Sequence, residues 1–110
     1  MGNISVRLSD LRPNQPRRVV IDGVPVSLVR VGDEVFAVGD VCSHAEVSLS
    51  EGEVSGCQIE CWLHGSRFDL RTGKPTGLPA TEPVATFPVD VRDGDVYVDT
   101  TTTLNGVTPS

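Results

Sequence analysis

The sequence predicts a small all-β domain, a barrel or a sandwich of antiparallel strands. Three observations support this prediction: short runs rich in valine and isoleucine alternate with turn dipeptides, no window of useful length has helical periodicity, and 11 glycines and 8 prolines occur at turn-like positions. Such a pattern is typical of short strands that fold around one core.

Three stretches, taken in chain order, predict strands. VVIDGVPVSLV (19–29) reads as two strands around a central Asp-Gly turn, and EVFAVG (34–39) is a further strand after a Gly-Asp turn. FPVDVRDGDVYVD (87–99) predicts a final hairpin around a second Asp-Gly turn. We expect the apolar residues of these strands to form the core: Val19, Val20, Ile21, Val26, Leu28, Val35, Phe36, Val38, Val89, Val91, Val96 and Val98.

The other segments predict less regular structure. Residues 42–80 are rich in Gly, Ser and Pro and lack clean alternation, so we interpret them as loops mounted on the sheet, with GCQIECW as an approach strand. The stretch after Asp99 has no hydrophobic pattern, and residues 100–110 are predicted to be a disordered tail. Residues 1–99 would then form a single domain.

Composition and charge narrow the possible functions. The chain has 15 acidic and 9 basic residues, so its formal net charge is −6. It therefore lacks the excess of basic residues that binding to nucleic acid or to an anionic membrane requires. The sequence contains neither a signal-peptide-like segment nor an apolar stretch of membrane-spanning length, so we expect a cytoplasmic protein. Three cysteines, an odd number, suit a reducing compartment in which thiols serve as metal ligands.

All the cysteines and histidines of the chain lie between residues 42 and 64. Cys42 and His44 form one pair, and Cys61 and His64 form a second, with sixteen residues separating His44 from Cys61. Each pair puts a thiol and an imidazole within one turn of chain, so that both can reach a common metal site.

Three interpretations of these pairs are open from the residues alone. The first is chance clustering of ordinary core or surface residues. The second is a tetrahedral zinc site of two Cys and two His, whose ligand count fits, although structural zinc sites usually pair like with like. The third is a [2Fe–2S] centre with two Cys on one iron and two His on the other, which mixed pairs suit.

Cys-x-His followed by Cys-x-x-His-Gly is the signature of Rieske proteins, and the chain resembles a small Rieske ferredoxin. HGSRFDLRTGKPTGLPATEPVATFPV (64–89) is similar to the same segment in the ferredoxin components of bacterial ring-hydroxylating dioxygenase systems. The resemblance implies a Rieske iron–sulfur fold, in which antiparallel β-sheets carry a loop-built cluster-binding subdomain at one end, here over about residues 40–80.

The resemblance also implies one [2Fe–2S] cluster with four protein ligands. Cys42 and Cys61 would hold the inner iron, and His44 and His64 the outer iron. Gly65 suits this site because a residue without a Cβ lets backbone amides approach the bridging sulfides.

Two departures from the high-potential Rieske subunits of respiratory complexes bear on the redox potential. Val47 and Leu63 stand where those subunits carry a disulfide between the ligand loops. Ser66 matches a serine that hydrogen-bonds a bridging sulfide, whereas Phe68 replaces a tyrosine that hydrogen-bonds a cysteine sulfur. Since a donor is missing near the sulfurs, we expect a potential toward the low end of the range of about −150 to +300 mV.

Residues around the ligands have further expected roles. Trp62 and Leu63, with Leu78 and Pro79 from a third loop that would cover the cluster, could form an apolar docking rim around the histidines. Cys57, the third cysteine, could be a redox-sensitive thiol or a spare ligand, but a buried small side chain is the favoured interpretation.

The resemblance implies a one-electron carrier with no catalytic residue of its own. Its transient partners would be an NAD(P)H-dependent flavin reductase and a terminal non-heme iron oxygenase, and we expect a monomer. The alternatives are a Rieske ferredoxin serving another redox pathway such as iron–sulfur cluster assembly, the small subunit of a nitrite-reductase-type enzyme, and a structural zinc module.

Overall fold

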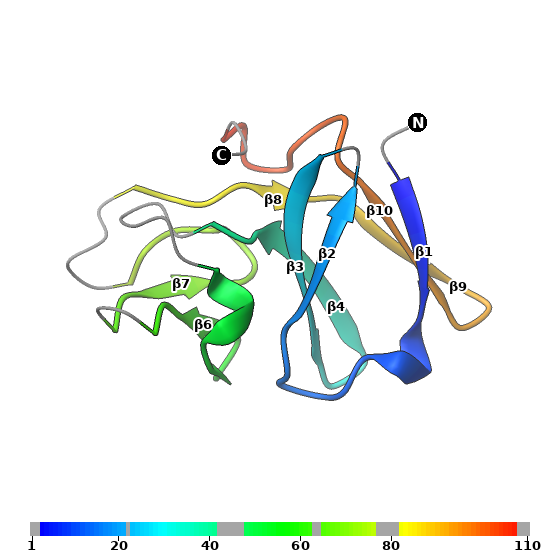
Figure 1. The fold of residues 1–110 in the computed structure, drawn as a ribbon, viewed down its shortest axis with the longest axis horizontal. Helices are drawn as coiled ribbons and strands as arrows, with labels where there is room; N and C mark the ends of the chain where they lie inside the picture. The colour runs from blue at the N-terminus through cyan, green and yellow to red at the C-terminus, as the bar shows by residue number, and fades with distance from the viewer. Residues whose placement is uncertain (1–2, 22, 42–47, 63–64, 77–81, 108–110) are drawn as a thin grey trace.

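The computed structural model describes residues 3–21, 23–41, 48–62, 65–76 and 82–107. These residues form short strands and two single-turn 3₁₀ helices (Figure 1). In chain order the elements are β1 (Asn3–Arg7), η1 (Leu8–Asp10), β2 (Arg17–Ile21), β3 (Val24–Val31), β4 (Glu34–Gly39), η2 (Leu49–Glu51), β5 (Val54–Ser55), β6 (Gln58–Glu60), β7 (Arg67–Asp69), β8 (Thr86–Phe87), β9 (Val89–Arg92) and β10 (Asp95–Asp99).

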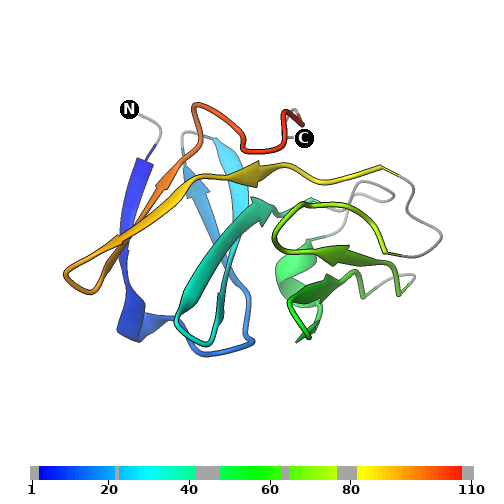
Figure 2. The same cartoon turned by 180° about the vertical axis from the view of Figure 1, so that it is seen from behind.

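The strands make three antiparallel sheets, so the predicted all-β, antiparallel fold class is confirmed. The strand orders are β1-β10-β9, β2-β3-β4-β8 and β5-β6-β7. The small third sheet and η2 lie at one end of the molecule, and the β9–β10 hairpin lies at the other (Figures 1 and 2). The longest dimension of the molecule is 39 Å, against 26 and 19 Å for the other two.

The hairpins predicted from turn dipeptides are present. β2 pairs with β3 up to Ile21 opposite Val24, and β9 pairs with β10 from Arg92 opposite Asp95. The strand predicted over 34–39 is β4, which pairs with β3 across the Gly32–Asp33 turn. Local turn chemistry therefore determined these three connections.

Two clusters of buried side chains occupy the two faces of the central sheet. Val26 and Leu28 of β3 face one cluster, which joins the central sheet to β1 and β10, while Val29 faces the other cluster, which lies beneath the small sheet. β3 is buried on both faces because it is an inner strand covered from both sides. The second cluster contains Val29, Val38, Leu49, Ile59, Cys61, Phe68, Leu70 and Val84.

Two expected core residues are exposed instead. Val20 is 50% exposed and Val91 is 41% exposed, whereas Ile21, Val26, Leu28, Val38, Val96 and Val98 are buried as predicted. Val20 and Val91 both lie on edge strands, β2 and β9. On β2, Val19 and Ile21 contact the first core cluster, so Val20 between them points to the opposite, uncovered face of the strand.

The middle third of the chain is more regular than predicted. Residues 42–80 were expected to be loops around one approach strand, but the described part contains the three-stranded sheet β5-β6-β7. Its strands have only two or three residues, too few for an alternating pattern to stand out in the sequence.

The structure also differs from the expected disordered tail over residues 100–107. Leu104 N donates to Thr86 O at 2.8 Å, and Val107 packs against the first core cluster. The Asn105 side chain donates to the carbonyl oxygens of Thr72 and Val84 at 2.9 and 2.8 Å and accepts from Thr86 N at 3.2 Å. One polar side chain thus attaches a segment without hydrophobic pattern to the body, while residues 108–110 lie outside the described residues.

Candidate metal centre

Cys61, one of the four predicted ligands, lies at the start of a tight turn after β6. Its side chain is 1% exposed. The turn is closed by two backbone hydrogen bonds, from Cys61 N to Ser66 O at 2.6 Å and from Gly65 N to Cys61 O at 2.9 Å. Gly65 has φ +75°, a left-handed conformation that a residue without a Cβ adopts readily. Gly65 is therefore suited to this position by its backbone conformation as well as by its lack of a Cβ.

This turn carries Trp62 on its outer side. The Trp62 side chain is 51% exposed although tryptophan is usually well buried. Leu63 and His64, the next residues in the sequence, lie outside the described residues. An exposed indole beside a predicted ligand is the geometry expected of a docking rim.

A second segment, 42–47, leaves the central sheet at the end of β4. Its two ends are joined by a bridge between Val41 and Ser48 and by a hydrogen bond of 2.5 Å from Leu49 N to Asp40 O. Leu49 is fully buried in the second core cluster with Cys61. The predicted ligands Cys42 and His44 lie within this segment, outside the described residues.

A third segment, 77–81, is also closed at its base. Thr76 N donates to Arg67 O at 2.8 Å, and Val84 N donates to Gly73 O at 2.9 Å. The first bond attaches this stretch to β7, next to the Ser66 end of the Cys61 turn, and the second joins its two sides. Leu78 and Pro79, the predicted covering residues, lie in this segment and outside the described residues.

The bases of all three segments therefore meet around one core cluster. Leu49, Cys61, Phe68 and Val84 come from four separate stretches of chain and pack in that cluster. Among the described residues no group of three or more His, Cys, Asp or Glu gathers, because three of the four predicted ligands lie in the undescribed segments.

Ser66, just before β7, and Phe68 in β7 lie close to Cys61: Ser66 O accepts from Cys61 N, and Phe68 shares its core cluster. The Ser66 side chain is 1% exposed and engages in a polar interaction, and Phe68 is fully buried in the same cluster as Cys61. Phe68 thus provides apolar packing beside the thiol and no hydrogen-bond donor.

Cys57 does not lie in the approach strand, as the sequence suggested, but in the turn between β5 and β6. It has φ +63°, next to Gly56 at +57°. The side chain is half-buried against the second core cluster, in part as predicted, and burial raises the pKa of its thiol, while the Arg71 guanidinium acts in the opposite direction. Neither Cys57 nor Cys61 forms a disulfide.

Sequence reasoning missed two polar side chains at the bases of these segments, Asp40 and Asn105. Asp40 is 1% exposed, which is rare for a carboxylate unless it is paired. The sequence signal available for Asp40 was its position two residues before the predicted ligand Cys42. Asn105 had no signal, since it lies in a stretch without pattern.

Three loop bases converge on a buried free thiol at one end of a β-domain, an arrangement that suits a loop-built metal centre. Residues 4–88 match the model of the Rieske [2Fe-2S] domain, and the chain belongs to that family. The family carries one Rieske [2Fe–2S] cluster.

The chain is similar to ferredoxins of aromatic-ring dioxygenases. It is 44% identical over 91 residues to Ferredoxin CarAc of Metapseudomonas resinovorans, covering 82% of this chain and 85% of the relative. It is 40% identical over 92 residues to the anthranilate 1,2-dioxygenase ferredoxin subunit of Burkholderia cepacia, covering 84% and 85%.

Two solved structures share the fold. The ferredoxin of carbazole 1,9a-dioxygenase from Nocardioides aromaticivorans IC177 has a TM-score of 0.86 and 39% identity, over 90% of this chain and 98% of that one. A chain in the complex of reduced oxygenase and oxidised ferredoxin in carbazole 1,9a-dioxygenase has a TM-score of 0.82 and 42% identity, over 86% and 99%.

The described part of the site fits a Rieske cluster. Cys61 offers a buried thiol without a disulfide partner, in apolar surroundings beside a buried serine. With Cys42 and the two histidines, all between residues 42 and 64 of the sequence, the chain has the donor chemistry that such a cluster needs.

Proposed function

We propose that this chain is a one-electron carrier that passes electrons from an NAD(P)H-dependent flavin reductase to a terminal non-heme iron oxygenase. The carrying observation is the convergence of three loop bases on the buried Cys61 in a chain of the Rieske family. A bound Rieske cluster supplies a couple that gains and loses single electrons. The protein itself holds the cluster and presents it, and it has no catalytic residue.

Four residues hold the cluster in this proposal. Cys42 and Cys61 bind the inner iron, and His44 and His64 bind the outer iron through ring nitrogens. The buried position of Cys61 suits an inner ligand. Because both irons have full protein coordination, no position remains for an organic substrate.

The residues around the ligands shield and present the centre. Ser66 provides a hydroxyl near the sulfurs, and its burial supports this role. Leu78 and Pro79 cover the cluster from the third segment. Trp62 and Leu63 form the apolar docking rim, which the 51% exposure of Trp62 supports.

Two partners engage this rim in turn. The oxygenase is supported by the chain of 42% identity that was solved in the complex of an oxygenase with a ferredoxin. The reductase follows from the need for an electron source. A net charge of −6 favours steering toward basic patches on both partners, and encounters of this kind are transient.

The remaining features of the proposal concern the form and place of the protein. Residues 1–99 constitute a single domain with its cluster-binding subdomain at about 40–80, and the protein acts as a monomer in the cytoplasm. In the part of the chain that the structure describes, no helix has the length and apolar character to cross a membrane.

The relatives also favour the oxygenase system over the alternatives. At 40–44% identity they are ferredoxin components of dioxygenases, rather than cluster-assembly ferredoxins, nitrite reductase subunits or zinc modules. Gene neighbours provide a second criterion: oxygenase and reductase genes support the proposal, and cluster-assembly genes would displace it.

The deciding experiment is the visible and low-temperature EPR spectrum of anaerobically purified protein, before and after dithionite. We expect a red-brown protein that becomes paramagnetic on reduction, with the low average g-value of a two-Cys, two-His cluster. A colourless protein with stoichiometric zinc would refute the electron-carrier function.

A further inference from the structure

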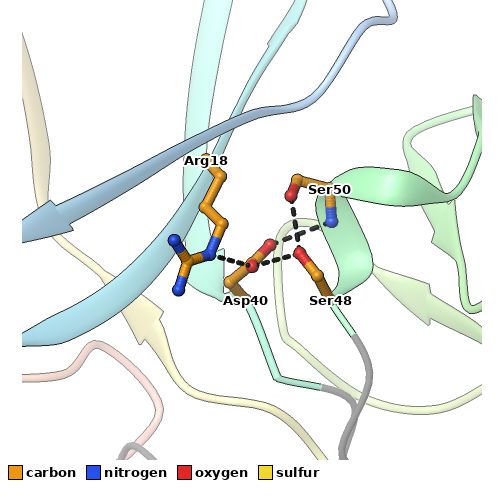
Figure 3. A network of polar contacts seen from close by, with 4 residues as sticks. All are labelled: Arg18, Asp40, Ser48 and Ser50. Carbon is orange, nitrogen blue, oxygen red and sulfur yellow. Dashed lines mark hydrogen bonds and ion pairs between the residues drawn. The ribbon is translucent and has the colours of Figure 1, made fainter.

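Asp40 is the centre of a buried polar network at the base of segment 42–47 (Figure 3). Its carboxylate is 1% exposed. Oδ2 accepts from Arg18 Nε at 3.1 Å and from the hydroxyl of Ser48, and Oδ1 accepts from Ser50 N at 2.9 Å. The hydroxyls of Ser48 and Ser50 are 2.7 Å apart. The buried charge is therefore compensated by three donors.

The partners of Asp40 come from β2 and from the far side of the segment. Asp40 directly follows β4 and precedes Cys42 by two residues, whereas Ser48 and Ser50 begin the chain beyond residue 47. Asp40 N also donates to Pro25 O at 3.1 Å, at the start of β3. The network thus attaches the far end of the segment to the central sheet through one carboxylate.

The donors differ in how strongly they hold this carboxylate. Arg18 is 53% exposed, so water and salt screen its ion pair. The donors of Ser48 and Ser50 bond a buried anion, and hydrogen bonds to a charged group are stronger than those between neutral groups. Closure of the segment therefore depends mainly on the two serines, with Arg18 as the neutralising charge.

The network is also continuous with the core that contains Cys61. Leu49, between the two serines, is fully buried in the second core cluster and donates its N–H to Asp40 O at 2.5 Å. A shift of Ser48 away from Asp40 would pull on Leu49, and the relative position of the two ligand-bearing segments would change.

We propose that Asp40 is a positioning residue for the first ligand segment, acting through Ser48 and Ser50, and that it limits how fast the protein loses its cluster. This inference rests on the proposed function, because it takes Cys42 and His44 to be ligands. Asp40 itself touches no iron in the proposal. It joins the two ends of the segment that carries Cys42 and His44, since Ser48 and Ser50 beyond the segment bond the carboxylate that precedes it.

The test compares the rate of bleaching by an iron chelator in the anaerobic holoprotein and its variants. Asp40→Asn keeps the side-chain shape but removes the charge and one acceptor. We expect about tenfold faster bleaching, the change that corresponds to losing one hydrogen bond to a charged group. Ser48→Ala should accelerate bleaching similarly, and Ser48→Thr, which retains a hydroxyl, should restore the wild-type rate.

A matched control separates this effect from general weakening. Asp90→Asn makes the same chemical change in an exposed Asp–Arg pair on β9, 2.6 Å from Arg92 and at the other end of the molecule (Figure 1). It should bleach at the wild-type rate. The EPR signal of reduced Asp40→Asn should broaden or shift, a change that lower global stability alone does not produce.

Several outcomes would overturn the inference. These are wild-type bleaching rates in both Asp40→Asn and Ser48→Ala, failure of Ser48→Thr to restore the rate, or acceleration fully explained by a lower urea midpoint. If Asp40→Asn does not fold, the Ser48 pair decides alone. A wild-type protein that carries no cluster refutes the proposed function instead, which is a separate result.

Discussion

The side-chain nitrogen of Asn105 lies 2.8 Å from the carbonyl oxygen of Val84, and it also donates to Thr72 O at 2.9 Å. One amide near the end of the chain thus spans the two sides of the stretch that contains segment 77–81. The same side chain accepts from Thr86 N at 3.2 Å, where β8 begins.

Replacing Asn105 by Ala should therefore loosen the base of this stretch. We expect a free energy of unfolding lower by about 1–2 kcal/mol, since two part-buried hydrogen bonds, with Val84 O and Thr86 N, are lost. Amide exchange at Thr86 should become faster, because its N–H loses its acceptor. Leu104→Ala, at a side chain that is 67% exposed, is the control and should leave both measurements unchanged.

Gly73 is a second sensitive position on the same stretch. It has φ +76°, and a Cβ there would lie 2.1 Å from Val84 O and 2.8 Å from Asn105 Nδ2. Gly94 has φ +80° but no atom within 4 Å of the corresponding position. Both alanine variants incur left-handed strain of about 1–2 kcal/mol, and Gly73→Ala adds a clash with backbone. Its urea-unfolding free energy should fall by at least about 2 kcal/mol more than that of Gly94→Ala. Equal losses would contradict the packing seen around Gly73.

Phe68→Tyr tests the redox consequence of the missing hydroxyl. Phe68 packs in the cluster that contains Cys61. A phenol hydroxyl that reaches a sulfur stabilises the reduced, more negative state. If it favours the reduced state tenfold over the oxidised state, the one-electron potential rises by about 60 mV. Protein-film voltammetry measures the shift. Phe87→Tyr, in the first core cluster, should disturb packing to a similar extent without raising the potential, and equal shifts in both variants would contradict the hydrogen-bond explanation.

Cys57 should react slowly with iodoacetamide near neutral pH. Burial raises the pKa of its thiol despite the opposing charge of Arg71, and the thiolate is the reactive form. The alkylation rate of Cys57 should therefore rise at a higher pH than that of an exposed cysteine, whose pKa is about 8.5. Mass spectrometry of the peptide over a pH series measures this, with Cys57→Ser to assign the label. A midpoint below the ordinary value would contradict the burial of this thiol.

The raised pKa of Cys57 also predicts how the free energy of unfolding changes with pH. Since the folded-state pKa lies above that of the unfolded chain, the protonated thiol contributes stability below about pH 8.5. This contribution is lost as the pH rises through the folded-state pKa. Cys57→Ala should accordingly flatten the alkaline decline in the urea midpoint.

The sequence predicted those parts of the fold that depend on local chemistry. The turns after Ile21 and Arg92 follow from Asp-Gly dipeptides, and the ligand spacing indicated the family before any contact was known. β1 could not be predicted, because Asn3–Arg7 is defined by pairing with β10 at the other end of the chain. Its register is a long-range property.

The polar groups at the bases of segments 42–47 and 77–81 were equally hidden. Asp40 and Asn105 have ordinary surface chemistry, and only the folded chain brings Asp40 next to Ser48 or Asn105 next to Val84. The exposure of Val20 and Val91 was missed for the same reason, since long-range packing decides which side chains of a strand are covered.

The division of the core into two clusters has a consequence for how the protein matures. The larger sheets surround their own cluster, which does not include Cys61, whereas β5, β6 and β7 have only two or three residues each. Strands so short are marginal without added support, and the second core cluster reaches the central sheet only through residues such as Val29 and Val38. Binding of iron and sulfide should therefore add more protection from amide exchange to β5, β6 and β7 than to the two larger sheets.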